Sequence, residues 1–226
     1  MLTQNTFDHL TGKYGCYGSW AVWIPNDPAD TSVIADNLNE LKTSVIVVGL
    51  NCSGRFAKRV HQHLGRSVEG HEGWQNFHGG KQDRKLMYAL NESPYRGAYL
   101  TDIIKGEFDV SSANVKERID ERLIDIGRHV TAFRDEMNDL AVDGDALFIL
   151  LGGAVEELFK GYLARFYKNY VRIDHYARRK ITDAEYVDKV WLKLERHCHN
   201  TRAKFDTLEF VRNTSMTNLL EELKRK

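Results

Sequence analysis

The sequence predicts an α/β fold built on one mainly parallel sheet. Apolar runs of strand length alternate along the chain with amphipathic segments of helix length. The run VIVVG at 45–49 shows no polar alternation, which is typical of a parallel strand covered on both faces. Three prolines and no low-complexity stretch leave no obvious linker. We therefore expect one domain over 1–226.

The elements follow from these patterns in chain order. The aromatic, turn-rich segment at 14–32 predicts irregular packing against the edge of the domain. We expect strands at 45–49, 97–105, 145–153 and 169–174. We expect helices at 32–44, 55–64, 81–91, 114–140 and 154–166, with more helix toward the C-terminus.

Composition limits the function classes. The 226 residues hold 32 Lys plus Arg and 32 Asp plus Glu, so no global field attracts a polyanion. This balance does not exclude a local basic groove. Three widely spaced cysteines fit a reducing compartment better than a disulfide framework. The N-terminus lacks a secretory pattern, and no apolar run is long enough to span a membrane. We expect a cytoplasmic monomer with no membrane partner.

Candidate ligand contacts stand where the predicted strands end, because open parallel sheets bind ligands outside the carboxyl ends of their strands. These ends carry Asn51, Asp102, Gly152–Gly153 and Asp174–His175. In the first, GLNCSG, glycines allow close backbone approach and asparagine both donates and accepts hydrogen bonds. The same residues suit a plain turn. The segment lacks the Lys-Ser/Thr pair of a P-loop and the GxGxxG of a dinucleotide site.

The last strand end is locally basic. His175 follows the predicted strand and is itself followed by Arg178, Arg179 and Lys180. The preceding segment adds Lys160, Arg165, Lys168 and Arg172. This pattern fits an anionic ligand or a solvated charged face.

The segment at 71–90 is too polar for core, and its Trp74 and Phe77 either anchor the loop or present a ring on which a base stacks. Two sets of residues raise the question of a metal site, namely His61 with His63, and His197 with Cys198 and His199. Neither set has a partner at zinc spacing, so we expect no metal and no other cofactor.

The order VVGLNCSG, NFHGGKQDRKLMYAL, YLTDIIK, LFILLGGAVEELF and IDHYARRK resembles the uracil-DNA glycosylase superfamily, mostly its mismatch-specific and thermophilic branches. In that family a G-x-N-P-G loop follows the first strand, and a His- or Asn-containing loop with basic residues follows the last. The resemblance spans 45–180. It implies a three-layer α/β/α sandwich, with 1–44 and 181–226 as extensions packed on it.

The resemblance also implies an activity. The protein would be a base-excision enzyme of DNA repair, which hydrolyses the N-glycosidic bond of a flipped, damaged or deaminated base in single- or double-stranded DNA. The alternative is a diverged member that binds a nucleotide or nucleic acid without cutting it. A third possibility is a metabolic enzyme on a flavodoxin-like sheet.

Site residues carry over by position. Asn51 would hold the attacking water, and His175 would donate to the departing base. The base would contact Gly49, Leu50, Cys52, Phe77 (with Phe56 as a rival) and Asp102. The DNA would contact Ser53, Arg55, Tyr176, Arg178, Arg179 and Lys180.

The chain departs from the family pattern at three places. Cys52-Ser53 replaces the proline of the first loop, and Asp174-His175-Tyr176 replaces His-Pro-Ser or Asn-Pro-Ser. Asp102 stands where several branches have an asparagine that reads uracil. An ionised carboxylate only accepts hydrogen bonds, so we expect an amino-bearing or damaged base rather than uracil. Alternatively, Asp102 faces away and pairs with Lys105.

Overall fold

The computed structural model describes residues 2–52, 73–107, 111–178, 180–202, 204–205 and 210–225. The strands are β1 (Ser19–Trp20), β2 (Lys42–Asn51), β3 (Ala98–Ile104), β4 (Leu147–Leu151) and β5 (Tyr170–Ile173). The helices before β4 are α1 (Gln4–Tyr14), α2 (Ser32–Asp36), α4 (Asp83–Asn91), α5 (Ser112–Asp120) and α6 (Ile126–Asp139). After β4 come α7 (Gly153–Leu158), the π-helical turn η1 (Phe159–Leu163), α8 (Asp183–Thr201) and α9 (Thr214–Arg225).

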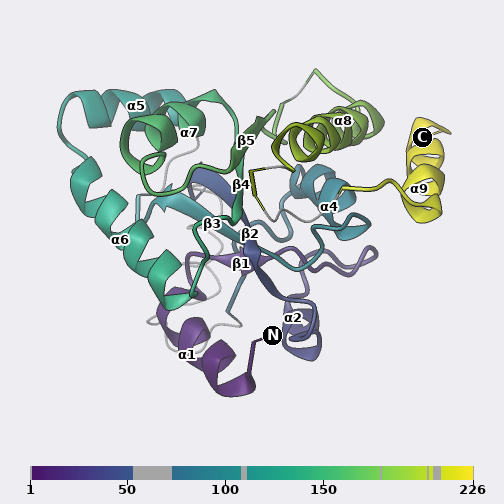
Figure 1. Ribbon diagram of the computed structural model, residues 1–226, viewed down its shortest axis with the longest axis horizontal. Coiled ribbons are helices and arrows are strands. Elements are labelled where there is room, and N and C mark those ends of the chain that lie inside the picture. The colour runs from purple at the N-terminus through teal and green to yellow at the C-terminus, as the bar shows by residue number, and fades with distance from the viewer. Residues whose placement is uncertain are drawn as a thin grey trace.

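The five described strands form one sheet in the order β1-β3-β2-β4-β5 (Figure 1). β2 pairs in parallel with both β3 and β4, and β4 pairs in parallel with β5, whereas β1 is antiparallel to β3. The α/β class and the mostly parallel sheet are therefore confirmed. β3 pairs with one edge of β2, and the next strand along the chain, β4, pairs with the other edge. The carboxyl end of β2 is therefore the topological switch point, where such sheets bind ligands.

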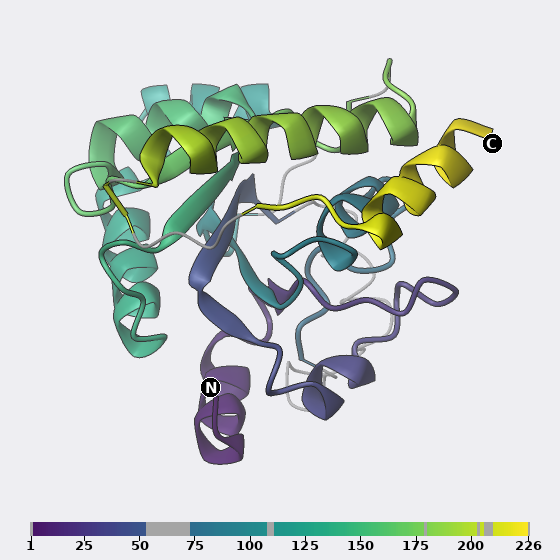
Figure 2. The same cartoon turned by 45° about the vertical axis from the view of Figure 1, so that its right-hand side comes forward.

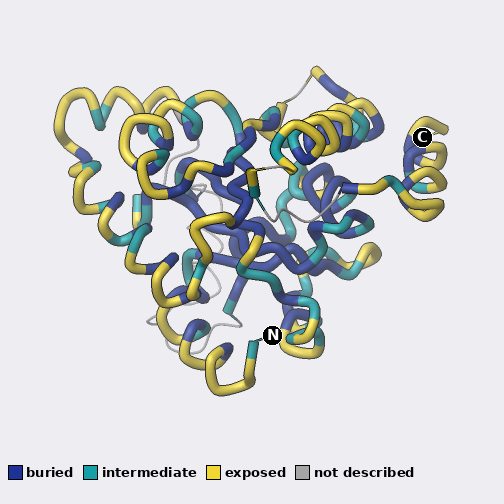
Figure 3. Tube along the Cα trace, viewed as in Figure 1, coloured by how far each residue is buried: buried dark blue, intermediate teal, exposed yellow. Residues whose placement is uncertain are grey.

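Helices cover both faces of this sheet, an arrangement compatible with the expected three-layer sandwich. Figures 1 and 2 show α4, α8 and α9 on one side and α1, α6 and α7 on the other. Successive β2 residues enter different hydrophobic clusters, Val47 on the α8 side and Val48 on the α6 side. This explains the unalternated run at 45–49, since both faces of β2 are buried (Figure 3).

Four expected elements differ from the structure. The helix expected over 32–44 is wrong after its first turn, because α2 ends at Asp36 and β2 begins at Lys42. The helix expected over 114–140 is wrong: α5 ends at Asp120, Arg122 adopts φ +60°, and Asp125 caps α6 by accepting the Arg128 N–H. The helix at 154–166 divides into α7 and η1. The segment at 14–32 contributes β1, whose Ser19 and Trp20 extend the sheet beyond β3. The helix expected at 55–64 lies outside the described residues.

The described helices include none that is long and apolar enough to cross a membrane.

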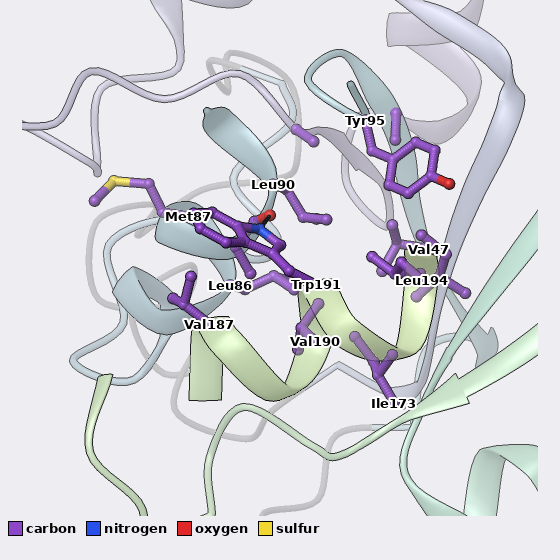
Figure 4. Packing of buried hydrophobic residues seen from close by; sticks show 14 of the residues in the cluster. Val47, Leu86, Met87, Leu90, Tyr95, Ile173, Val187, Val190, Trp191 and Leu194 are labelled. Atoms are coloured by element: carbon purple, nitrogen blue, oxygen red, sulfur yellow. Dashed lines mark hydrogen bonds between the residues drawn. The ribbon is translucent and has the colours of Figure 1, made fainter. Parts of the chain in front are cut away.

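α8 packs on α4 on one face of the sheet. Trp191 is fully buried between them, and its indole N–H donates to the Ala89 carbonyl at 2.8 Å (Figure 4). The capping box of Thr182 and Glu185 begins α8, where the Glu185 N–H donates to Thr182 Oγ1. α8 therefore starts at a defined point directly after the loop that follows β5.

Trp191→Ala is expected to lower the free energy of unfolding by about 3–5 kcal/mol, because it leaves a large cavity and an unpaired Ala89 carbonyl. The neighbouring Leu192 is 37% exposed, so Leu192→Ala should change it by less than about 0.5 kcal/mol. Urea unfolding of the two variants beside the wild type measures both. Equal losses would contradict the packing described.

Candidate functional site

The carboxyl halves of β2 and β3 bring Gly49 and Asp102 side by side, in register. Asp102 is 5% exposed, and a Cβ on Gly49 would lie 2.1 Å from its Oδ1 and 3.3 Å from the Phe77 ring. A side chain at position 49 would push the carboxylate away. Glycine is therefore required here by the close approach of Asp102, which stands two residues inside β3 rather than at its end.

The buried Asn76 side chain organises the groups around Asp102. Its Nδ2 donates to Asp102 Oδ2 at 2.8 Å and to the Tyr17 carbonyl at 2.7 Å. Its Oδ1 accepts the Phe77 N–H at 3.2 Å and lies 3.5 Å from Cys52 Sγ. One amide thus connects the ends of β2 and β3 with the segment that precedes α4.

The segment at 74–78 is held in an uncommon conformation. Trp74 adopts φ +76° and Phe77 adopts φ +66°, values that cost energy for side chains of this size. The Trp74 N–H donates to the Gly15 carbonyl at 2.6 Å, its indole N–H donates to Thr11 Oγ1 at 3.1 Å, and its carbonyl accepts from Ser19. These bonds to α1 and β1 hold the strained loop and fix where Asn76 and Phe77 point.

Burial raises the pKa of Asp102 to about 6, an effect partly offset by the Asn76 amide and the charge of Lys105. The side chain is therefore mostly ionised at neutral pH. Lys105 forms its ion pair with the fully buried Glu136 at 2.5 Å and donates to the Asp102 backbone carbonyl at 2.9 Å. The Asp102 carboxylate faces Asn76, so the alternative in which it pairs with Lys105 is not the arrangement observed.

The loop after β5 closes over this group. The Tyr176 ring lies 6.5 Å from the Phe77 ring and stacks on the His175 ring at 4.6 Å. Burial raises the pKa of the Tyr176 hydroxyl well above its usual value, and the charges of Asp83 and Asp102 raise it further. The hydroxyl therefore stays protonated beside these carboxylates.

His175 is placed as a neutral donor. Its Nδ1 accepts the Ala177 N–H at 3.1 Å, which leaves the ring proton on Nε2. Desolvation lowers the pKa of His175, so the ring is neutral at neutral pH. The loop lies against Gly152, whose φ of +97° favours glycine, and a Cβ there would contact the His175 Cβ at 3.4 Å.

The structure brings together five residues expected in the site, Gly49, Cys52, Phe77, Asp102 and Tyr176. His175 joins them through Tyr176. Ser53, Arg55, Phe56 and Arg179 lie outside the described residues.

Other expected residues have different surroundings. The Leu50 side chain is buried in the cluster on the α6 side, on the face of β2 opposite Phe77, and its contact with a base stays a prediction. Asn51 Nδ2 donates to the carbonyls of Cys52 and Glu107, at 3.0 and 3.3 Å. Arg178 is exposed and ion-paired with Asp174 at 2.7 Å, and Lys180 is exposed.

Sequence reasoning missed Asn76, Lys85 and Glu136. Lys85 is buried and donates to the carbonyls of Arg178 and Ile181, at 3.0 and 2.8 Å, which ties α4 to the loop after β5. Glu136 had a signal, because it is a charged residue on the apolar face of α6. Asn76 had none, since its role depends on the backbone of a loop.

The described cluster at 197–199 is not grouped as a metal site. His197 Nε2 lies 2.9 Å from Asn169 Oδ1, and Cys198 Sγ lies 3.0 Å from the Tyr95 hydroxyl. His61 and His63 lie outside the described residues. Within the described ranges, no three His, Cys, Asp or Glu side chains are grouped to hold a metal ion.

No family model, curated protein or solved structure matches this chain.

Asp102→Asn is expected to stabilise the fold near pH 8 by up to about 3 kcal/mol. The pKa of Asp102 rises from 3.8 to about 6 on folding, so its contribution to stability is complete below about pH 4 and is lost as the pH rises through 6. The gain should therefore vanish near pH 4. Urea unfolding at both pH values measures it.

Asp27→Asn, at an exposed position, is the control and should have little effect at either pH. A variant at position 102 no more stable than the wild type near pH 8 would contradict the burial of an ionised carboxylate.

Proposed function

We propose that this chain is a DNA glycosylase-like base-excision enzyme with the fold of the uracil-DNA glycosylase superfamily. The observation that carries the proposal is the grouping of a buried amide–carboxylate pair, Asn76 and Asp102, with the rings of Phe77 and Tyr176 at the switch point of the sheet. Polar groups that read an edge and rings that stack are what a flipped base requires.

Each side chain has a role in this proposal. Asp102 accepts hydrogen bonds from an exocyclic amine and repels the O4 of uracil, which favours an amino-bearing base. Phe77 and Tyr176 supply the stacking surface. In the transition state negative charge develops on the base, and the Nε2–H of His175 is the neutral donor that stabilises it. Asn51, at the end of β2, holds the attacking water in this proposal.

The second candidate function is binding of a nucleotide or nucleic acid without cleavage. One observation favours it. The Asn51 amide nitrogen is directed at two backbone carbonyls, so it is engaged in holding the loop. In both candidates the ligand lies at Asp102, which is so deeply buried that a base reaches it only when neighbouring side chains move. The two candidates differ in turnover.

A strand-cleavage assay tests the proposal. Labelled single- and double-stranded oligonucleotides carrying uracil, hypoxanthine, xanthine, mispaired thymine, or mispaired adenine or cytosine are incubated with protein and then treated with alkali. We expect wild type to prefer an amino-bearing base. His175→Ala should lower the cleavage rate about 100-fold or more and leave binding nearly unchanged. His9→Gln, at an exposed position on α1, is the control and should cleave as wild type.

The variants separate the outcomes. Asn51→Ala should also lose cleavage, and Asp102→Asn should shift the preference toward uracil. Binding without cleavage of any substrate would favour the second candidate. Neither binding nor cleavage would contradict both.

A further inference from the structure

A shallow groove of about 510 Å³ lies beside β5, outside the site described above. β5 is the outermost strand of the described sheet, and Figure 1 shows it between α7 and α8. The charged side chains that line the groove come from α7, η1, the approach to β5, β5 itself and α8. They are Glu156, Lys160, Lys168, Arg172 and Lys193.

The groove carries an excess of positive charge. Lys160 contacts Glu156 at 2.8 Å and Arg172 contacts it at 3.4 Å. The lining therefore holds four cations, of which two pair with its one carboxylate. The Lys160 and Arg172 side chains are 54% and 42% exposed, and Lys168 and Lys193 are also exposed. A chain with no net charge therefore has a local surplus of positive charge that favours an anion.

Lysines beside an edge strand also have a purely protective role, because they discourage pairing with another chain. Here, however, the cations are not confined to the strand: Lys160 comes from η1 and Lys193 from α8, and both converge on one hollow. Tyr170, half-buried, lines the same hollow. Cations beside an aromatic ring are the combination with which grooves bind single-stranded nucleic acid.

Neighbouring residues connect the groove with the candidate site. Arg172 Nη1 lies 4.0 Å from the position of a Cβ on Gly153, and a Cβ on the adjacent Gly152 would contact His175. His175 in turn stacks on Tyr176. The loop that follows β5 therefore lies between the groove and the residues around Asp102.

We propose that the groove along β5 binds the phosphate backbone of the nucleic-acid strand whose base is recognised at Asp102. The proposal rests on the proposed function for the identity of the polyanion. It adds a binding surface of Lys160, Lys168, Arg172 and Lys193, away from the loops that hold the base.

Fluorescence anisotropy with a labelled, undamaged single-stranded oligonucleotide tests this on the full chain. Lys168→Glu combined with Lys193→Glu should weaken binding about tenfold or more and reduce its salt dependence, because phosphate contacts release counterions. Lys189→Glu combined with Lys224→Glu makes the same charge change at exposed positions outside the groove and should have a much smaller effect. All four lysines are exposed, so both variants should stay folded by circular dichroism.

Three results would contradict nucleic-acid binding in the groove: wild type binds no oligonucleotide, the two variants lose affinity equally, or polyglutamate competes more strongly than unlabelled oligonucleotide does. The cleavage assay separates this proposal from the first. If the groove variant binds more weakly and no substrate is cleaved, the groove is supported and the glycosylase activity is contradicted. If a substrate is cleaved and the groove variant binds as wild type does, the glycosylase activity is supported and the groove is contradicted.

Discussion

The hydrogen bond from Asn76 to the buried Asp102 carboxylate is the interaction on which this end of the molecule depends. It requires glycine at position 49, and it draws a loop with two positive φ angles against the sheet. A buried charge with one side-chain donor destabilises the fold at neutral pH. Strain and an ionised buried group in one place are typical of functional sites, where the cost is retained because a ligand uses the arrangement.

The sequence predicts the four parallel strands well because each of them is defined by local composition, whereas the short antiparallel β1 is not. The apolar run at 45–49 and its partner at 97–105 lie in β2 and β3, and their ends meet as the parallel arrangement requires. The break between α5 and α6 is not predictable in this way, since the apolar spacing continues through it. A capping aspartate at 125 and one left-handed residue at 122 decide it.

The site divides in the same manner. Asp102 and His175 are recognisable because they stand at or near strand ends, where the fold class alone places ligands. The sequence does not show which face of the sheet the Leu50 side chain takes, because one step along a strand reverses that face. Asn76 gains its partners only from a folded loop held by Trp74, a tertiary arrangement with no signature in the sequence.

Carbon NMR of the protein labelled at its aspartate carboxyl groups tests the proposal that Asp102 reads an amino-bearing base. Cytosine, adenine and uracil are added in turn as free bases, with the exposed Asp27 as an internal reference. We expect cytosine or adenine to shift the Asp102 resonance and to lower the Asp102 pKa, because an amine donor favours the ionised form, and we expect uracil to do neither. An Asp102 resonance that no base moves, or that uracil moves equally, would contradict it.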